Sequence, residues 1–161
     1  QGDFVDLAKH VMHELKPRLS RKLKMELVNN VKGKVEAEVD ADKILNVIFN
    51  FVDNAIKYTE SGKISIVLEK DQQKIIVRIK DTGIGLSAED KEKVFSKFFR
   101  SKDVLAAVGR SGTGLGLYIA AKFVAGHNGE IWCDSPGKDQ GSEFGFSVPL
   151  KQAVKVTQVE A

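Results

Sequence analysis

Apolar residues along this chain recur with two different periods. In four segments they return every three to four residues, which is the period of an amphipathic helix with one buried side. Asp40 or Asp42 can cap the second of these helices, and Ser87 can begin the third. The predicted helices span residues 4–17, 40–59, 87–95 and 114–126.

Six other segments alternate apolar and polar residues, as half-buried strands do. The first two are expected to pair as a hairpin, because Asn29, Asn30 and Gly33 lie between them. Since strands are predicted to pair by hairpins with helices inserted between the pairs, we expect an α/β fold with a mixed, mostly antiparallel sheet and helices on one face. The predicted strands are 22–28, 34–39, 63–69, 74–80, 130–134 and 142–150.

Composition narrows the class of protein. The chain has 161 residues, 42% of them hydrophobic and 29% charged, which suits a single domain over 1–161 with its core at about 4–150 and a frayed tail at 151–161. No apolar run reaches the roughly 18–20 residues that cross a bilayer, so no membrane contact is expected. A net charge of +3 without a dense basic stripe disfavours nucleic acid as a partner. Cys133 is the only cysteine, which excludes an internal disulfide and favours a reducing compartment.

Asparagines recur at every fourth residue of the predicted helix 40–59. Asn46, Asn50 and Asn54 share one face, because residues four apart stack above one another on a helix. The rest of the circumference is mostly apolar, so this stripe must face something polar. An unpaired buried amide costs roughly 1–3 kcal/mol. The stripe is therefore either a water-satisfied seam between two layers or a ligand-binding face.

A second candidate site begins at Asp81, at the end of an apolar strand. The sequence continues Thr-Gly-Ile-Gly, and Gly83 and Gly85 let backbone approach a flat ligand closely. A carboxylate accepts hydrogen bonds, and an exocyclic amine such as that of adenine is a natural donor. The alternative is an ordinary Asp-Gly turn with a local hydrogen bond.

Three alternating glycines, Gly112, Gly114 and Gly116, open directly into the last predicted helix. Exposed amides at a helix N-terminus and the helix dipole attract phosphate. A glycine hinge before a closely packed helix is the alternative. The spacing matches neither the GxxxxGK[ST] loop nor the dinucleotide fingerprint.

Aromatic and cationic residues lie between the two glycine-rich segments. Phe95, Phe98, Arg100 and Lys102 suggest a lid that closes over a polyanion. Phe95 and Phe98 are themselves expected in the core, and Arg100 and Lys102 suit a solvated surface equally well.

Four motifs in this order resemble the N, G1, F and G2 boxes of the histidine-kinase catalytic and ATP-binding domain. They read NxxDNAxKYT, DTGIG, VFSKFFR and GTGLGLYIA, at 50–59, 81–85, 94–100 and 112–120. The resemblance extends over about 4–150. It implies the Bergerat fold, a two-layer α/β sandwich shared with gyrase, a heat-shock chaperone and mismatch-repair proteins.

The resemblance also implies roles for particular residues. Asn50 would coordinate Mg²⁺ and Asp81 would recognise the adenine amine, while Asn50, Lys57 and Arg100 would serve phosphoryl transfer. The residues expected to contact ATP are Asn50, Asn54, Lys57, Tyr58, Asp81, Gly83, Ile84, Gly85, Phe98, Arg100, Gly112, Thr113, Gly114, Leu115, Gly116 and Leu117.

Hydrolysing members of the wider superfamily resemble this chain but carry Glu where Asn50 stands, and that Glu activates water. An amide has no basicity near neutral pH, and Asp53 lies about 100° away around the helix. A phosphotransferase that awaits a separate nucleophile is therefore implied. His13 precedes Glu-Leu-Lys-Pro, which is similar to an acceptor box, but no dimerising hairpin fits here, so the acceptor is expected elsewhere. His127 is expected to be a structural turn residue.

The implied function is transfer of the γ-phosphoryl group of Mg-ATP to a histidine on a dimerisation domain absent from this chain, with a response regulator as an indirect partner. The domain is expected to be cytoplasmic and monomeric, whether or not its parent protein is anchored in a membrane. Two alternatives stay open: a serine kinase of the anti-sigma-factor type, and a catalytically silent nucleotide-binding module.

Overall fold

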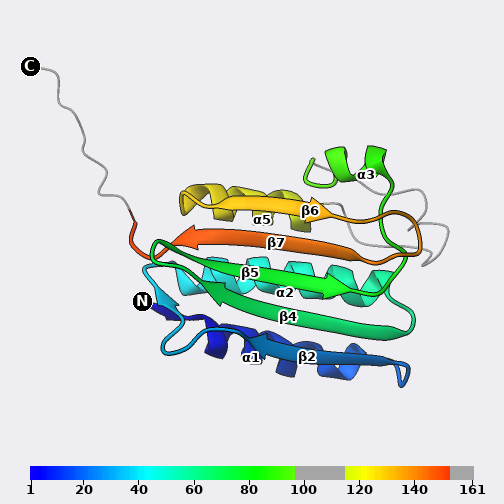
Figure 1. The fold of residues 1–161 in the computed structure, drawn as a ribbon, viewed down its shortest axis with the longest axis horizontal. Coiled ribbons are helices and arrows are strands. Elements are labelled where there is room, and N and C mark those ends of the chain that lie inside the picture. The colour runs from blue at the N-terminus through cyan, green and yellow to red at the C-terminus, as the bar shows by residue number, and fades with distance from the viewer. Residues whose placement is uncertain (97–114, 153–161) are drawn as a thin grey trace, which may run out of the picture.

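A five-stranded sheet and a layer of helices make up the fold of this chain (Figure 1). The computed structural model describes residues 1–96 and 115–152. The sheet has the order β2-β4-β5-β7-β6, and only the β2–β4 pair is parallel. Its strands are β2 (Leu23–Asn29), β4 (Gly62–Lys70), β5 (Lys74–Asp81), β6 (Glu130–Asp134) and β7 (Ser142–Pro149). This arrangement confirms the predicted fold class.

Helices α1, α2 and α5 cover one face of the sheet (Figure 1). α2 packs against α1 on one side and α5 on the other. The helices are α1 (Phe4–Leu15), α2 (Ala41–Tyr58), α3 (Ala88–Lys93) and α5 (Gly116–Gly126), and the 3-10 turn η1 (Lys16–Arg18) follows α1. None of these described helices is long and apolar enough to cross a membrane.

Short polar side chains begin the first three helices. The Asp3 carboxylate accepts from the amide of Val5 at 2.9 Å at the start of α1. Of the two caps proposed for α2, Asp40 is the correct one, because its carboxylate accepts from the Lys43 amide at 3.2 Å. Ser87 caps α3 as predicted, by accepting from the Asp90 amide. Each cap satisfies an amide that the helix itself leaves unpaired.

The predicted hairpin between 22–28 and 34–39 is wrong. β2 pairs in parallel with β4, with Leu23 opposite Gly62, and β3 (Glu36–Ala37) pairs with β1 (Gly2–Asp3) in a separate ribbon. Val35 and Ala37 are fully buried, so the chain after β2 packs into the core and does not return along β2. A parallel pair needs a long crossover, and α2 supplies it between β2 and β4. Alternation of apolar and polar residues is the same in a parallel and in an antiparallel pair, so it could not distinguish them.

Aromatic rings join the two layers at the centre of the core. Phe51 of α2 lies with its ring centroid 5.7 Å from that of Phe144 and 5.9 Å from that of Phe146, both on β7. Phe95 adds an edge-to-face contact with Phe144 at 6.1 Å, which confirms its predicted place in the core. Such pairs contribute about 0.5–1.5 kcal/mol each beyond the apolar area that they bury.

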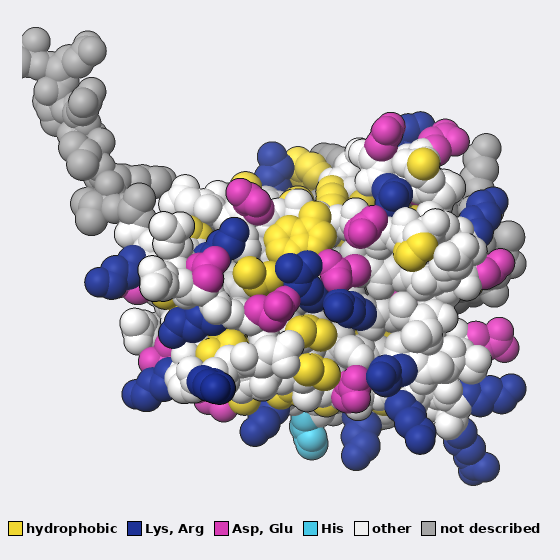
Figure 2. All heavy atoms as spheres, viewed as in Figure 1, with side chains coloured by type: hydrophobic (Ala, Val, Ile, Leu, Met, Phe, Trp, Pro, Cys, Tyr) yellow, Lys and Arg dark blue, Asp and Glu magenta, His cyan; other side chains and the backbone are white. Residues whose placement is uncertain are grey.

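The opposite face of the sheet is covered by its own long side chains. The Trp132 ring lies on Gly145, and its indole N–H donates to Glu143 at 3.0 Å. The Arg78 guanidinium lies 5.3 Å from the Trp132 ring centroid and pairs with Glu69 and Glu143. Figure 2 shows cationic and anionic side chains interspersed over this face. These side chains cover the sheet face opposite the helices, which has no further layer of helices or strands in the described part of the chain.

The contact between Trp132 and Gly145 gives a test of this packing. A Cβ at position 145 would lie 2.3 Å from the indole ring, so Gly145→Ala must displace Trp132. We expect a loss of about 1–3 kcal/mol in the free energy of unfolding, measured by urea titration followed by tryptophan fluorescence. Gly126→Ala is the control, because nothing lies within 4 Å of its Cβ position and Ala favours a helix. Equal stability of the two variants would contradict the packing role of Trp132.

Candidate functional site

The asparagine stripe of α2 faces the start of α5. Asn50 donates through Nδ2 to the carbonyl of Asn46 at 3.0 Å and to its side-chain oxygen at 2.7 Å. Both N–H groups of the amide are therefore engaged, and Oδ1 is the end of the side chain left to accept. A Cβ at Gly116 would lie 2.6 Å from this Oδ1. The absence of a side chain at position 116 is what lets the Asn50 oxygen occupy this place.

Asp81 lies at the end of β5 and is 7% exposed. Its Oδ1 accepts from the amides of Gly83 at 2.9 Å and Ser142 at 3.2 Å, and its Oδ2 accepts from the Ser142 hydroxyl at 2.7 Å. A carboxylate has about four acceptor positions, and the described residues use three of them. One position on Oδ2 is left for a ligand donor.

Burial raises the pKa of the Asp81 carboxyl above its ordinary value. The hydrogen bonds from Ser142 and Gly83 act in the opposite direction but do not cancel this effect. The site therefore holds an acceptor whose charge is only partly compensated. An N–H donor on a ligand would complete that compensation.

The loop after Asp81 is fastened to the end of α2 by backbone groups. The Ile84 amide donates to the Tyr58 carbonyl at 3.0 Å, and a Cβ at Gly83 would lie 2.1 Å from the same oxygen. Gly85 has a φ of +68°, and a Cβ there would lie 2.1 Å from the Gly137 carbonyl oxygen. No L side chain fits at either glycine without moving backbone, which explains both residues of the DTGIG motif physically.

A cavity of about 280 Å³ lies between the end of α2, η1 and the start of β2. Thr59 lies in its wall, is 2% exposed, and has a hydroxyl without a hydrogen-bond partner in the described part of the chain. The same hydroxyl lies 2.7 Å from the Cβ position of Gly83. The cavity is lined by Arg18, Ser20, Leu23, Ile56, Lys57, Tyr58, Thr59, Glu60 and Ile84.

Lys57 takes part in an ion-pair network that joins α2 to η1. Its ammonium lies 3.1 Å from the Asp53 carboxylate, which also accepts from Arg18 at 2.8 Å. The Arg18 guanidinium lies 5.8 Å from the ring centroid of Phe49. Asp53 is thus neutralised by two cations, so it would keep Arg18 as a partner when Lys57 turns to another anion.

The sequence predicts a set of site residues, and most of those within the described part of the chain lie on three neighbouring elements. Asn50, Asn54, Lys57 and Tyr58 lie along α2, Asp81 to Gly85 lie at the adjacent end of the sheet, and Leu115 to Leu117 begin α5. Predictions for Phe98, Arg100, Gly112, Thr113 and Gly114 lie outside the described residues.

Sequence reasoning missed Ser142, which makes two of the three hydrogen bonds to Asp81. The two residues lie opposite each other in the antiparallel β5–β7 pair. Only the strand register brings them together, because they are 61 positions apart in the sequence. The sequence shows that both residues are polar and lie at the ends of predicted strands, but it does not show that these two strands pair.

His127 is a structural residue, as predicted. Its Nδ1 donates to the Phe123 carbonyl at 2.7 Å, and its Nε2 accepts from the Asp40 amide at 3.0 Å. A carbonyl only accepts and an amide only donates, so these partners select the tautomer with hydrogen on Nδ1. The ring joins the end of α5 to the start of α2.

Comparison with known proteins identifies the class. Residues 39–152 match the family described as histidine kinase-, DNA gyrase B- and HSP90-like ATPases, and the chain belongs to this family. In structure it is similar to the mycobacterial sensor histidine kinase MprB, with a TM-score of 0.79 at 22% identity, covering 94% of this chain and 97% of that one. The predicted family and fold are confirmed.

Two relatives with higher sequence identity than MprB are also sensor kinases. The chain is 35% identical over 138 residues to the sensor histidine kinase WalK of Bacillus subtilis (strain 168), covering 83% of this chain and 22% of WalK. It is 37% identical over 152 residues to the adaptive-response sensory kinase SasA of Synechococcus sp. (strain JA-2-3B'a(2-13)), covering 92% of this chain and 39% of SasA.

A solved structure narrows the identification to one domain. The catalytic domain of the histidine kinase ThkA has a TM-score of 0.76 at 30% identity, covering 92% of this chain and 95% of that one. The chain is a histidine kinase catalytic domain of two-component signalling, and it spans about a fifth to two fifths of the length of the curated relatives just named.

The raised pKa of Asp81 predicts how stability depends on pH. A carboxyl whose pKa is higher in the folded state costs stability once it ionises; this cost begins to shrink as the pH falls through the folded pKa and is gone below the unfolded pKa. We expect Asp81→Asn to be at least as stable as the wild type at pH 7, with the difference shrinking on acidification because the wild-type carboxyl also becomes neutral. Urea unfolding over a pH series measures this.

Asp71→Asn provides a control of opposite sign. Hydrogen bonds from the amides of Gln73 and Lys74 lower the pKa of the exposed Asp71 carboxyl, so its ionised form stabilises the fold. This variant should be less stable at neutral pH, and its deficit should shrink as the pH falls. A large, pH-independent loss in Asp81→Asn would instead show that the hydrogen bonds of Asp81 outweigh its burial.

Proposed function

We propose that this chain binds Mg-ATP between α2, the loop after β5 and the start of α5. The γ-phosphoryl group then passes to a histidine on a separate dimerisation domain, and a response regulator receives it afterwards. The observation that carries this proposal is that Asp81 and Asn50 each present a side-chain oxygen that can accept from or bind a ligand. One presents an acceptor for a base amine, and the other presents a side-chain oxygen at the glycine-rich start of a helix.

The Asn50 oxygen suits a magnesium ion held together with phosphates. Mg²⁺ takes oxygen ligands and is commonly bound by one or two protein groups plus substrate phosphate oxygens. The two hydrogen bonds from Nδ2 to Asn46 keep the oxygen end of the amide available. Magnesium would neutralise charge that develops on the phosphates during transfer.

The same contacts favour transfer to a protein nucleophile over hydrolysis. The Asn50 amide has no basicity with which to activate water. Asp53, the nearest carboxylate along α2, is held by Arg18 and Lys57. Lys57 and Tyr58 would contact phosphate, and Asn54 would lie beside it. Phosphoryl transfer depends mainly on such positioning and charge stabilisation, so no general base within this chain is required.

The acceptor histidine is assigned to another segment or protein. His13 is exposed on α1 and lines a surface groove together with Met12 and Lys16. We place the activity in the cytoplasm, where ATP and response regulators occur, and expect the isolated domain to be a monomer.

Calorimetric titration with a non-hydrolysable ATP analogue tests the nucleotide and metal assignments. Asp81→Asn should weaken binding at least tenfold with or without Mg²⁺, because it removes the acceptor for the base amine. Asn50→Ala should weaken binding mainly in the presence of Mg²⁺, because it removes a metal ligand. Equal losses for Asn50→Ala in both conditions would contradict the metal role, and unchanged binding by Asp81→Asn would contradict the base assignment.

Phosphotransfer distinguishes the proposed kinase from its two alternatives. With γ-labelled ATP, Mg²⁺ and the dimerisation domain of its parent kinase, the chain should label that domain with an acid-labile, base-stable phosphoryl group, as phosphohistidine is. Acid-stable label would indicate the serine kinase. Binding of ATP without any label in the acceptor would indicate the silent binding module.

A further inference from the structure

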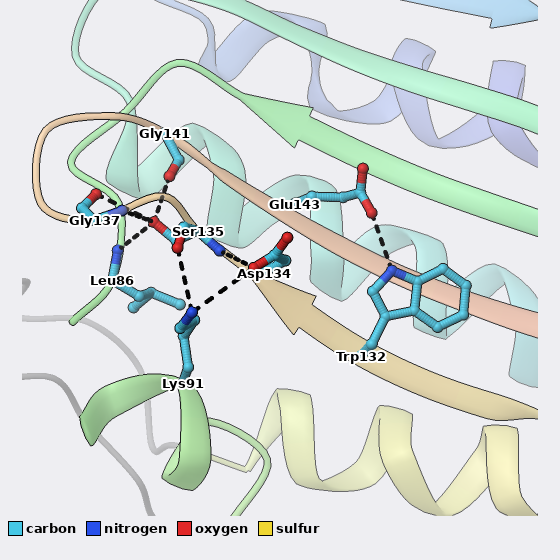
Figure 3. Close-up of polar contacts among 8 residues, drawn as sticks. All are labelled: Leu86, Lys91, Trp132, Asp134, Ser135, Gly137, Gly141 and Glu143. Atoms are coloured by element: carbon cyan, nitrogen blue, oxygen red, sulfur yellow. Dashed lines mark hydrogen bonds and ion pairs between the residues drawn. The ribbon is translucent and has the colours of Figure 1, made fainter. Parts of the chain in front are cut away.

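Ser135, directly after β6, has a buried hydroxyl at the meeting point of two loops (Figure 3). The hydroxyl accepts from the Leu86 amide at 3.0 Å and from the Gly137 amide at 3.2 Å, and it donates to the Gly141 carbonyl at 2.7 Å. The Gly137 carbonyl lies within reach of the same hydrogen, at 3.2 Å. One donated and two accepted bonds are the full capacity of a serine hydroxyl. The two loops therefore use all of it.

The partners of this hydroxyl lie on both sides of the Asp81 carboxylate. Gly141 directly precedes Ser142, which donates two hydrogen bonds to Asp81. Leu86 ends the loop that contains Gly83, whose amide donates the third. The hydroxyl of Ser135 thus connects the two segments that supply every described hydrogen bond to this carboxylate.

Backbone contacts make the connection between these loops direct. The Gly141 amide donates to the Gly83 carbonyl at 3.0 Å, and the Asp139 amide donates to the Ile84 carbonyl at 2.6 Å. A Cβ at Gly85 would lie 3.0 Å from the Ser135 hydroxyl oxygen. Because Gly85 has no side chain, the two loops are in direct backbone contact, and a shift of one is transmitted to the other.

The carbonyl of Ser135 is also held, by a side chain from α3. Lys91 donates to this oxygen at 3.3 Å, and its ammonium lies 3.7 Å from the Asp134 carboxylate. Figure 3 shows Lys91 reaching from α3 toward both groups. Ser135 is therefore fixed from two directions, through its hydroxyl and through its backbone.

We propose that Ser135 is a positioning residue for base recognition, which fixes the geometry of Asp81 by holding Gly141 and Leu86 at a set separation. This inference rests on the proposed function, because it assigns the Asp81 end of the site to the nucleotide base. Ser135 touches no ligand itself. Its loss should therefore change which base the site prefers more than it changes the phosphate end, which α2 and α5 build.

The test compares Ser135→Ala with Ser147→Ala. Ser147 is equally buried, at 4% exposure against 5%, and lies on β7 five residues beyond Ser142. Dissociation constants for ATP and GTP are measured by competition against trinitrophenyl-ATP, and the melting temperature of each variant is recorded. We expect Ser135→Ala to lower the preference for ATP over GTP about tenfold, and Ser147→Ala to leave it unchanged.

Two results would overturn the inference. One is an unchanged preference for ATP in Ser135→Ala, and the other is equal weakening of both nucleotides, which a purely structural role would produce. Lys91→Met provides a second variant in case Ser135→Ala does not fold, because it keeps the apolar stem of a partly exposed side chain. It should lower the same preference at least twofold, and an unchanged preference there would also overturn the inference.

The wild-type measurement separates this inference from the proposed function. If the wild-type chain binds neither trinitrophenyl-ATP nor ATP, the proposed function fails. If it binds ATP selectively and the Ser135 and Lys91 variants do so as well, only the role of Ser135 fails.

Discussion

The placement of α2 is the constraint on which the rest of this structure depends. One side of the helix is buried against the sheet, where the Phe51 ring contacts the rings of Phe144 and Phe146 on β7. The asparagine stripe is then turned toward the start of α5, and Asp53 pairs with Lys57 and with Arg18 of η1. A single helix thereby orients a polar face toward the candidate site while it fills the centre of the core.

Much of this arrangement follows from local pattern. The helical period and a cap at Asp40 or Asp42 predict α2, and alternation predicts β4 and β5. These features are local, because a helix or a hairpin is specified by residues close together in the chain. Asp81 and the asparagines could be recognised as candidate site residues for the same reason.

Pairing between distant segments could not be predicted in this way. β2 has the alternation of a hairpin strand, yet it pairs in parallel with β4, because α2 returns the chain to the same end of the sheet. Ser142 faces Asp81 only through the β5–β7 register, and Ser135 reaches Leu86 only through the fold of the loop that follows β6. Alternation determines which side of a strand is buried, but it contains no information about the neighbouring strand.

The hydrogen bond from the Ile84 amide to the Tyr58 carbonyl has a consequence for ligand choice. It joins the end of α2 to the loop after β5, so a backbone contact links the helix that presents Asn50 to the loop that follows Asp81. A ligand that used both groups would then be selected by length, because the distance from its amine to its anionic groups would have to match the spacing between Asp81 and Asn50.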